Sequence, residues 1–434
     1  MRIVICLLLL CPSLGRAAWT NLAISSVSRS GLMTWINAYS NGVCTIETTA
    51  ALTNSNRTNQ WRPLTNYFTT NTSQGQLTVN SSNRFFRLLA VDVSTNTPMG
   101  ASNLFKSYGL LHTIAGNGSG CTDGVNYWLP GYEGAYATNV ALSRPHNVMA
   151  DDAGDIFIVD KDSHSVLKVT ADGRIHTVAG THLAGNGSDA TNHATNVSLY
   201  APTGLWVHGN GSFHILDTGN GKIRRVDTNG MISTFLTVPG GILVGRGLWV
   251  EDDESDVYFC SGTTVKAWHS TNGFVTLNSS FVDLGNIHVT PTKENVVAAD
   301  RGASQIWKVD TGGGNLGTRT LVYGDGHTHP VVDGTSALTN SLNGVRGIWK
   351  FPTDGYLLAL HEGDQILYVD PMDNLHIMVD GYSGLHSGDG QWFHSPGYKV
   401  SQSRAVTMDS QGNILIVEND CGYVRKIDFQ RLTP

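Results

Sequence analysis

The stretch that decides the fold runs Arg144-Pro-His-Asn-Val-Met-Ala-Asp-Asp-Ala-Gly-Asp-Ile-Phe-Ile-Val-Asp160. It continues as Ser165-Val-Leu-Lys-Val169, turns at Asp172-Gly173 and closes on Ile175-His-Thr-Val-Ala-Gly180. The short apolar segments are bounded by Gly, Asn and Asp, a pattern that predicts four strands joined by tight turns.

This four-strand unit recurs about six times between Leu111 and Ile427. A second clear copy starts at Ala201-Pro-Thr-Gly-Leu-Trp206, and fainter copies start at Arg246, Gly285, Val345 and Ser403. Four-stranded units repeated around an axis form a β-propeller, so the repeats predict an all-β propeller with six blades.

The two ends of the repeat region predict how the ring closes. The sixth copy stops after its third strand, Tyr423-Val-Arg-Lys-Ile-Asp428. The missing fourth strand is supplied by Leu111-His-Thr-Ile-Ala-Gly116, which nearly duplicates Ile175-His-Thr-Val-Ala-Gly180. We therefore expect the N- and C-terminal strands of the propeller to share one blade.

These motifs resemble the NHL-repeat family of β-propellers. The matching features are the Pro-then-apolar start, the Gly-Asp or Gly-Asn turn, the Ile-Arg-Lys-Val type of third strand and the Val-Ala-Gly close. Loops such as Ala194-Thr-Asn-Val-Ser-Leu199 match as well. The resemblance implies the fold but not the function, since this fold hosts both enzymes and binding proteins.

The rest of the chain divides around the repeats. Residues 1–17 read as a secretory signal peptide, because Met1-Arg2 is followed by an apolar run and a small-residue exit at Ala17. Alternating apolar positions in 18–94 predict a small all-β domain that loosely resembles fibronectin type III modules. Residues 95–109 read as a linker, and 110–434 as the propeller.

Charge and composition narrow the function. The formal charge is −7, and removing Arg2 and Arg16 with the signal peptide would make it −9. No concentrated basic stripe appears, so nucleic acid is excluded as a partner. Beyond the signal peptide no apolar run is long enough to span a membrane. We expect a secreted, extracellular monomer, or a periplasmic one if the host is bacterial.

Four cysteines remain after the signal peptide, and they allow three pairings. Cys121 follows the closing strand, and Cys421 lies between the second and third strands of the same blade, where both loops emerge on one face. We predict a Cys121–Cys421 disulfide, which an exported protein permits. Cys260 ends an apolar strand and reads as a buried hydrophobe.

Aligned copies point to a ligand site at the mouth of the central channel. One equivalent place, the start of the innermost strand, holds His146, Thr203, Gly247, Asn286, Gly347 and Arg404, flanked by Arg246 and Arg346. If these side chains point inward, His146, Arg246, Arg346 and Arg404 favour an anionic or carboxylate ligand. The alternative is that each arginine bonds loop carbonyls and holds neighbouring blades together.

The longest inserts, on the same predicted face, are rich in aromatic and His residues. From them we predict a rim of Trp128, Trp392 and His394, suited to a protein, peptide or carbohydrate ligand.

The sequence favours a non-catalytic binding protein. No nucleophile elbow or phosphate-binding glycine motif appears. The acidic turn Glu251-Asp-Asp-Glu254 reads as solvated. The alternative is an extracellular lyase or hydrolase of the channel, with His146 placed like a ligand of peptidyl-hydroxyglycine lyases, a family these repeats resemble. No cofactor is predicted, although zinc or calcium is possible.

Overall fold

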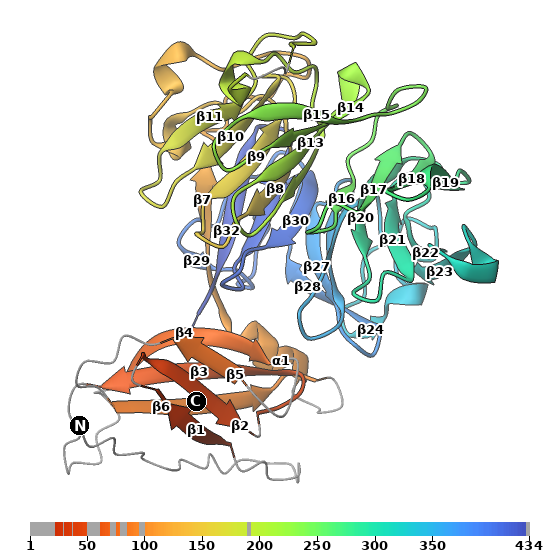
Figure 1. Cartoon of the computed structure of the whole chain (residues 1–434). Coiled ribbons are helices and arrows are strands. Elements are labelled where there is room, and N and C mark those ends of the chain that lie inside the picture. Colours follow the sequence, from red (N-terminus) through yellow and green to blue (C-terminus); the bar gives the residue numbers. More distant parts are fainter. Residues whose placement is uncertain are drawn as a thin grey trace.

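The computed structural model describes residues 22–28, 30–36, 38–49, 61–69, 75–78, 85–94, 100–188 and 192–430. The predicted signal peptide, residues 1–17, lies outside the described residues. Within them, the chain is built almost wholly of short antiparallel strands, with one short α-helix and several single 3-10 turns. The all-β propeller expected from the sequence is confirmed (Figure 1).

The propeller strands form six sheets of four or five strands among the described residues, named here sheet 1 to sheet 6 in chain order. Sheet 1 contains β8 (Pro145–Ala150), β9 (Ile156–Asp160), β10 (Ser165–Val169) and β11 (Ile175–Ala179). Sheet 2 contains β12 (Gly204–Val207), β13 (Phe213–Asp217), β14 (Lys222–Val226) and β15 (Ile232–Thr237). Sheet 3 contains β16 (Leu248–Val250), β17 (Asp256–Ser261), β18 (Thr264–His269) and β19 (Gly273–Asn278).

The remaining three sheets follow the same strand order, and two of them gain a strand. Sheet 4 contains β20 (Leu284–Val289), β21 (Asn295–Asp300), β22 (Gln305–Asp310) and β23 (Arg319–Tyr323). Sheet 5 contains β25 (Val345–Lys350), β26 (Tyr356–Leu360), β27 (Gln365–Val369), β28 (Asn374–Val379) and the edge strand β24 (Thr335–Ser336). Sheet 6 contains β30 (Ser403–Met408), β31 (Ile414–Glu418), β32 (Tyr423–Phe429), β7 (Tyr108–Ala115) and the edge strand β29 (Gln391–Trp392).

The first strands of the sheets line up side by side. Each of β8, β12, β16, β20, β25 and β30 contacts the first strand of the next sheet, and β30 contacts β8. The buried apolar residues between neighbouring sheets form the core clusters of the propeller.

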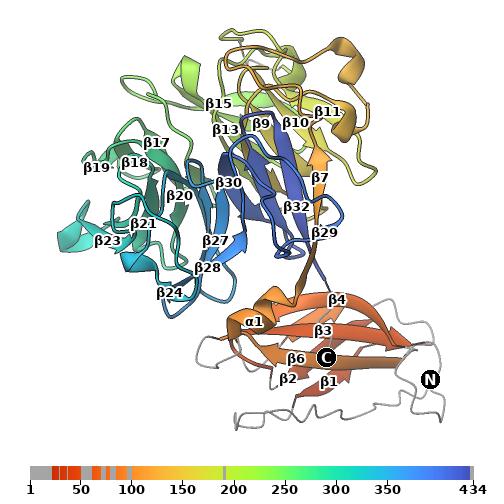
Figure 2. The same ribbon diagram turned by 180° about the vertical axis from the view of Figure 1, so that it is seen from behind.

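The closure of the ring is confirmed at sheet 6. The strand from the start of the repeat region, β7, pairs with the last strand, β32, with Leu111 opposite Ile427 and Ala115 opposite Val424. In Figure 1 β7 is orange and β32 is blue, and the two strands lie side by side in both views (Figures 1 and 2). The predicted disulfide joins Cys121 to Cys421 next to this seam.

The N-terminal strands form two three-stranded sheets that pack below the propeller in Figure 1. One sheet holds β1 (Ala23–Val27), β2 (Leu32–Ile36) and β5 (Gly75–Thr78); the other holds β4 (Arg62–Thr69), β3 (Gly42–Thr49) and β6 (Phe85–Asp92). Trp35, Met33 and Ile46 are fully buried between them. This arrangement is the small all-β unit expected from the sequence.

The segment predicted as a linker is structured over part of its length. It contains the helix α1 (Gly100–Phe105), and β7 already begins at Tyr108. Leu104 is fully buried, and the Phe105 ring packs edge-on against His376 of sheet 5, with centroids 5.9 Å apart. The segment predicted as the linker, 95–109, therefore contains a helix that packs against the propeller and the start of β7.

Aromatic rings dock the N-terminal unit onto the propeller. The Phe68 ring of β4 stacks on Phe429 at the end of β32, with centroids 4.5 Å apart, and meets Phe351 edge-on at 5.4 Å. Phe351 lies in the turn between β25 and β26, so docking uses the turns that follow first strands. The opposite face, where the turns between second and third strands lie, is left uncovered by these contacts.

Candidate functional site: the mouth of the propeller channel

The site residues lie where the first strand of a sheet begins, and a β-bulge aims them. The register of β8 against β9 shifts between Pro145 and Asn147, which places His146 in the bulge. The same shift falls at Arg346 in sheet 5 and at Arg404 in sheet 6. Bulges re-aim side chains at functional positions, and here the same device recurs in three sheets. The register shows that Arg346, and not Gly347, is equivalent to His146 and Arg404.

Arg404 bridges two imidazoles at the centre of the site. Its Nη1 lies 2.5 Å from His146 Nε2, and its Nη2 lies 3.4 Å from Nε2 of His361, which follows β26. A guanidinium can only donate, so both Nε2 atoms accept and a neutral imidazole carries its proton on Nδ1. Burial, followed by the charge of Arg404, lowers the pKa of His146 well below 6.5, so this imidazole is neutral at physiological pH.

Arg246 and Arg346 approach the same centre with fewer partners. Arg246 Nη1 donates to the carbonyl of Leu284 in the next sheet at 3.3 Å, which is the backbone role considered as the alternative. Arg346 Nη2 lies 4.0 Å from Glu362 Oε1. Glu362 is already engaged by Arg301, whose Nε donates to Oε1 at 2.8 Å.

Several buried donors at the mouth have no hydrogen-bond partner. We call the guanidinium groups of Arg246, Arg346 and Arg404, together with the neutral His146, the cationic cluster; each residue is nine-tenths buried or more. Within the part of the chain that the structure describes, no hydrogen-bond partner meets Nε of Arg246, Nε and Nη1 of Arg346, Nε of Arg404 or Nδ1 of His146. In the protonation state described above, all five atoms carry a proton and can only donate. A ligand with hydrogen-bond acceptors would therefore satisfy them.

Repulsion among the arginine charges of the cluster also favours a bound anion. Burial, then the charges of Arg346 and Arg246, lowers the pKa of Arg404 well below its usual range. Burial, then Arg246 and Arg301, lowers the pKa of Arg346 to about 9. A bound anion would offset both the desolvation and the repulsion.

Apolar side chains border one side of the mouth. Tyr200, Leu243 and Val282 are exposed by 47%, 67% and 63% and precede the first strands of sheets 2, 3 and 4. Their segments lie against the turns after the second strands: the Tyr200 carbonyl accepts from Gly219 N at 2.8 Å, and the Val244 carbonyl accepts from Gly262 N at 2.9 Å. The three residues therefore occupy similar places on three neighbouring sheets and are named here the apolar arc.

The structure places two of the three residues of the predicted aromatic rim away from the channel. Trp392 lies in β29, which pairs with β7 at the outer edge of sheet 6, opposite the channel side of that sheet. His394 follows it and packs on Phe105 of α1, with centroids 5.4 Å apart. The insert folds outward because it supplies a fifth strand, which the repeat pattern did not indicate.

Trp128, the third member, lies in the long insert of sheet 1. Its ring stacks on His182 with centroids 4.4 Å apart and an interplanar angle of 2°, so the two inserts of 117–143 and 181–200 are held together. Burial lowers the pKa of His182 to about 4, which keeps the stacked imidazole neutral. The role of Trp128 in ligand binding stays a prediction.

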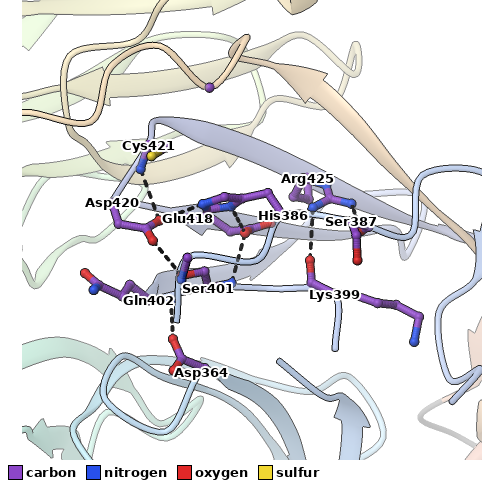
Figure 3. A network of polar contacts seen from close by, with 12 residues as sticks. Asp364, His386, Ser387, Lys399, Ser401, Gln402, Glu418, Asp420, Cys421 and Arg425 are labelled. Carbon is purple, nitrogen blue, oxygen red and sulfur yellow. Dashed lines mark hydrogen bonds and ion pairs between the residues drawn. The ribbon is translucent and has the colours of Figure 1, made fainter. Parts of the chain in front are cut away.

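Behind the mouth, a polar network fixes the insert of 382–402 to sheet 6 near the disulfide (Figure 3). His386 Nδ1 lies 2.6 Å from Glu418 Oε2, and its Nε2 lies 3.2 Å from Asp420 Oδ1. On its other side Glu418 accepts from Arg425 Nη1 at 2.8 Å, and Ser401 N donates to its Oε2 at 3.0 Å. The closing sheet and its insert are thus joined by charged groups.

This network should make stability depend on pH. Burial alone would lower the pKa of His386, but its contacts with Asp420 and Glu418 outweigh burial and raise it to about 9. A raised folded-state pKa stabilises fully below the unfolded value of about 6.5 and is lost as pH rises towards 9. We expect the free energy of unfolding to fall by about 2 kcal/mol between pH 6.5 and 9.5, measured by urea denaturation. The variant His386→Gln should flatten that interval; an unchanged slope would contradict the assignment.

Comparison with known proteins supports the fold and leaves the family open. No family model matches the chain. A curated relative, Protein SUPPRESSOR OF QUENCHING 1, chloroplastic, from Arabidopsis thaliana, is 34% identical over 101 residues; the match covers 23% of this chain and 9% of that protein.

Solved structures of similar fold include proteins of different kinds. A protein of unknown function from Bacteroides thetaiotaomicron aligns with a TM-score of 0.58 and 10% identity, over 94% of this chain and 97% of the other. An auxiliary nutrient binding protein from the same organism aligns with a TM-score of 0.54 and 14% identity, over 74% and 76%. A putative gluconolactonase aligns with a TM-score of 0.50 and 9% identity, over 76% and 95%. At these identities the likeness concerns the propeller fold.

Two members of the site were not singled out from the sequence. His361 and Arg301 lie just after second strands, in turns that pattern analysis treats as connections. The signal that could have found them is their position: in this fold the turn after the second strand shares a face with the start of the first.

Proposed function

We propose that this protein is an extracellular binding protein that holds an anionic ligand at the mouth of its propeller channel. The observation that carries the proposal is the set of five unpartnered donors on the buried cationic cluster. Buried donors without acceptors cost about 1–3 kcal/mol each, so an anion that pairs with several of them gains strongly. Arginine forks match carboxylate or phosphate oxygens in particular.

The side chains beside the cationic cluster narrow the chemical class of the ligand further. The apolar arc of Tyr200, Leu243 and Val282 lies on one side of the mouth. An amphipathic acid would place its anionic group on the cationic cluster and its apolar body against the arc. We propose a carboxylate with an apolar or aromatic body, presented either by a free small molecule or by a peptide end.

The state of His146 disfavours the enzymatic alternative. A general base needs a free lone pair, but His146 Nε2 already accepts from Arg404 at 2.5 Å, which leaves a protonated Nδ1 facing the site. His146 then acts as one more donor to an anion. A lyase or hydrolase working through His146 would first have to break that contact.

We propose an extracellular location, which one feature of the structure supports. The Cys121–Cys421 disulfide is a bond that persists in oxidising compartments. Within the described residues, no helix is long and apolar enough to cross a bilayer. The N-terminal unit docks on the face away from the mouth, and we propose that it spaces or anchors the propeller while the mouth stays accessible.

The test compares benzoate with benzamide, which has the same shape and no charge. Titration calorimetry at fixed, low ionic strength should show saturable binding of benzoate and none of benzamide, since only the carboxylate can pair with the cluster. Arg346→Met should weaken benzoate binding by at least tenfold, because a lost charge-assisted hydrogen bond is worth about 1.5–3 kcal/mol. The matched control Arg62→Gln removes a charge from the exposed surface of β4 and should change nothing.

A second pair of measurements isolates the apolar arc. Leu243→Ser should weaken benzoate binding but leave acetate binding unchanged, because acetate has no body to place against the arc. Phosphate serves as the inorganic comparison. Failure of every anion to bind, or equal binding by the Arg346→Met protein, would contradict the proposed function.

A further inference from the structure

A second polar site lies far from the mouth, between sheets 2 and 3. A pocket of about 450 Å³ is bordered by the turn after β12 and the turn after β16. Its residues are His208, Gly209, Asn210, Ser212, Arg225, Asp252, Asp253 and Glu254. These turns follow first strands, so the pocket opens on the face opposite the channel mouth, on sheets other than those that dock the N-terminal unit.

Two buried histidines and a glutamate meet at this pocket. His208 and His214 are 8% and 0% exposed, and His208 Nε2 lies 3.2 Å from His214 Nδ1. His214 Nε2 lies 3.5 Å from Glu254 Oε1. One ligand atom from each of the three residues can be chosen so that all lie within 4.8 Å of one another. Among the described residues, these three side chains form a group close enough together to hold one metal ion.

The hydrogen bonds fix which nitrogen of His208 carries a proton. His208 Nδ1 lies 3.2 Å from the Asp252 carboxylate, which can only accept, so Nδ1 of His208 holds the proton. Its Nε2 is then a lone pair, 3.2 Å from Nδ1 of His214. The proton of His214 can lie on Nδ1, donating to His208, or on Nε2, which is fully buried and faces the Glu254 carboxylate at 3.5 Å.

With the proton of His214 on Nε2, the lone pairs of His208 Nε2 and His214 Nδ1 face each other 3.2 Å apart. Neutral imidazole is the form that binds transition metals. Two ligands about 2.1 Å from a tetrahedral zinc ion lie about 3.4 Å apart. The 3.2 Å between His208 Nε2 and His214 Nδ1 is close to that separation.

We propose that His208, His214 and Glu254 form a binding site for a divalent transition metal, with zinc the ion that the ligand set fits best. The Asp252 carboxylate holds His208 through its other ring nitrogen, the arrangement that orients metal-bound histidines. Arg225 Nε donates to Glu254 Oε1 at 2.5 Å, so Glu254 has its second oxygen available for the ion. Three protein ligands would leave a tetrahedral ion one position for water or a ligand.

The test uses the full chain, first dialysed against a chelator. Titration with zinc, followed by calorimetry and elemental analysis, should give one tightly bound ion per chain. Glu254→Gln and His208→Gln should each weaken the binding by at least tenfold, because each removes a ligand. Cobalt loading adds a second readout, since a tetrahedral cobalt site has strong visible absorption that these variants should lose.

Two neighbouring acids provide a matched pair of variants. Asp252→Asn should weaken zinc binding by about tenfold, because it removes the carboxylate that orients His208. Asp253→Asn removes the same charge from the same turn, but its carboxylate caps Ser255 N at 2.9 Å and does not touch either histidine, so binding should be retained. Should His208→Gln fail to fold, the more exposed Glu254 decides. No saturable binding, or equal binding in the Glu254→Gln and Asp253→Asn proteins, would overturn the proposal.

Discussion

Removing the Cys121–Cys421 disulfide should lower the free energy of unfolding by about 3–5 kcal/mol. The bond joins residues 300 positions apart, so it closes a loop that spans almost the whole propeller. Cross-linking so long a loop restricts the unfolded chain by up to about 6 kcal/mol in the chain-entropy description, and engineered cases generally deliver less. The measurement is urea denaturation of the double variant Cys121→Ser, Cys421→Ser against the oxidised protein.

Reducing agent supplies the control for this prediction. The unmodified protein treated with dithiothreitol should shift to the midpoint of the double variant, whereas the double variant should not respond. Cys44 and Cys260 are buried, and burial raises the pKa of each thiol to about 12, so neither should react in the folded state. A loss below about 1 kcal/mol would mean that the pairing of β7 with β32 alone holds the ring closed.

The closure of the propeller ring was predictable from the sequence because it rests on a repeated sequence motif. Ile175-His-Thr-Val-Ala-Gly180 and Leu111-His-Thr-Ile-Ala-Gly116 are near copies, so the second had to occupy the place of a fourth strand, and the disulfide followed from the loops beside it. The N-terminal unit could be read as all-β from alternation. Its docking could not, because Phe68, Phe351 and Phe429 come from three distant segments with no shared pattern.

The channel site was predictable in part for a related reason. His146 and Arg404 align between copies, but the bulge in the first strand shifts the register by one residue, and letters alone do not reveal which residue a bulge contains. Arg346 was therefore placed beside the equivalent position instead of in it.

Side-chain clusters that form between two sheets could not be predicted from the sequence, for another reason. Glu254 appears solvated in its own turn, and only the packing of sheet 3 against sheet 2 brings it to His214. The placement of Trp392 and His394 away from the channel could not be foreseen, because an edge strand such as β29 belongs to no repeat.

Replacing Arg346 by Met should stabilise the ligand-free protein while it weakens anion binding. The Arg346 guanidinium is 5% exposed, two of its donors have no partner, and Glu362 is 4.0 Å away. Exchanging a poorly paired buried charge for an apolar side chain of similar length is often stabilising, here by about 1–2 kcal/mol. Glu362 would not be left unpaired, since Arg301 Nε remains 2.8 Å from its Oε1.

The matched variant Arg301→Met should change the free energy of unfolding in the opposite direction and destabilise the protein. Arg301 Nη1 lies 2.7 Å from Asp283 Oδ2, and its Nε donates to Glu362. Removing Arg301 therefore leaves these two partly buried carboxylates, of their arginine contacts, only the longer ones with Arg246 and Arg346, both at 4.0 Å. We expect this variant to lose about 1–3 kcal/mol by urea denaturation. A residue retained at a cost to stability is characteristic of a functional site, so the opposite signs would tie Arg346 to ligand and Arg301 to structure. Destabilisation by Arg346→Met would instead assign Arg346 to holding neighbouring sheets together.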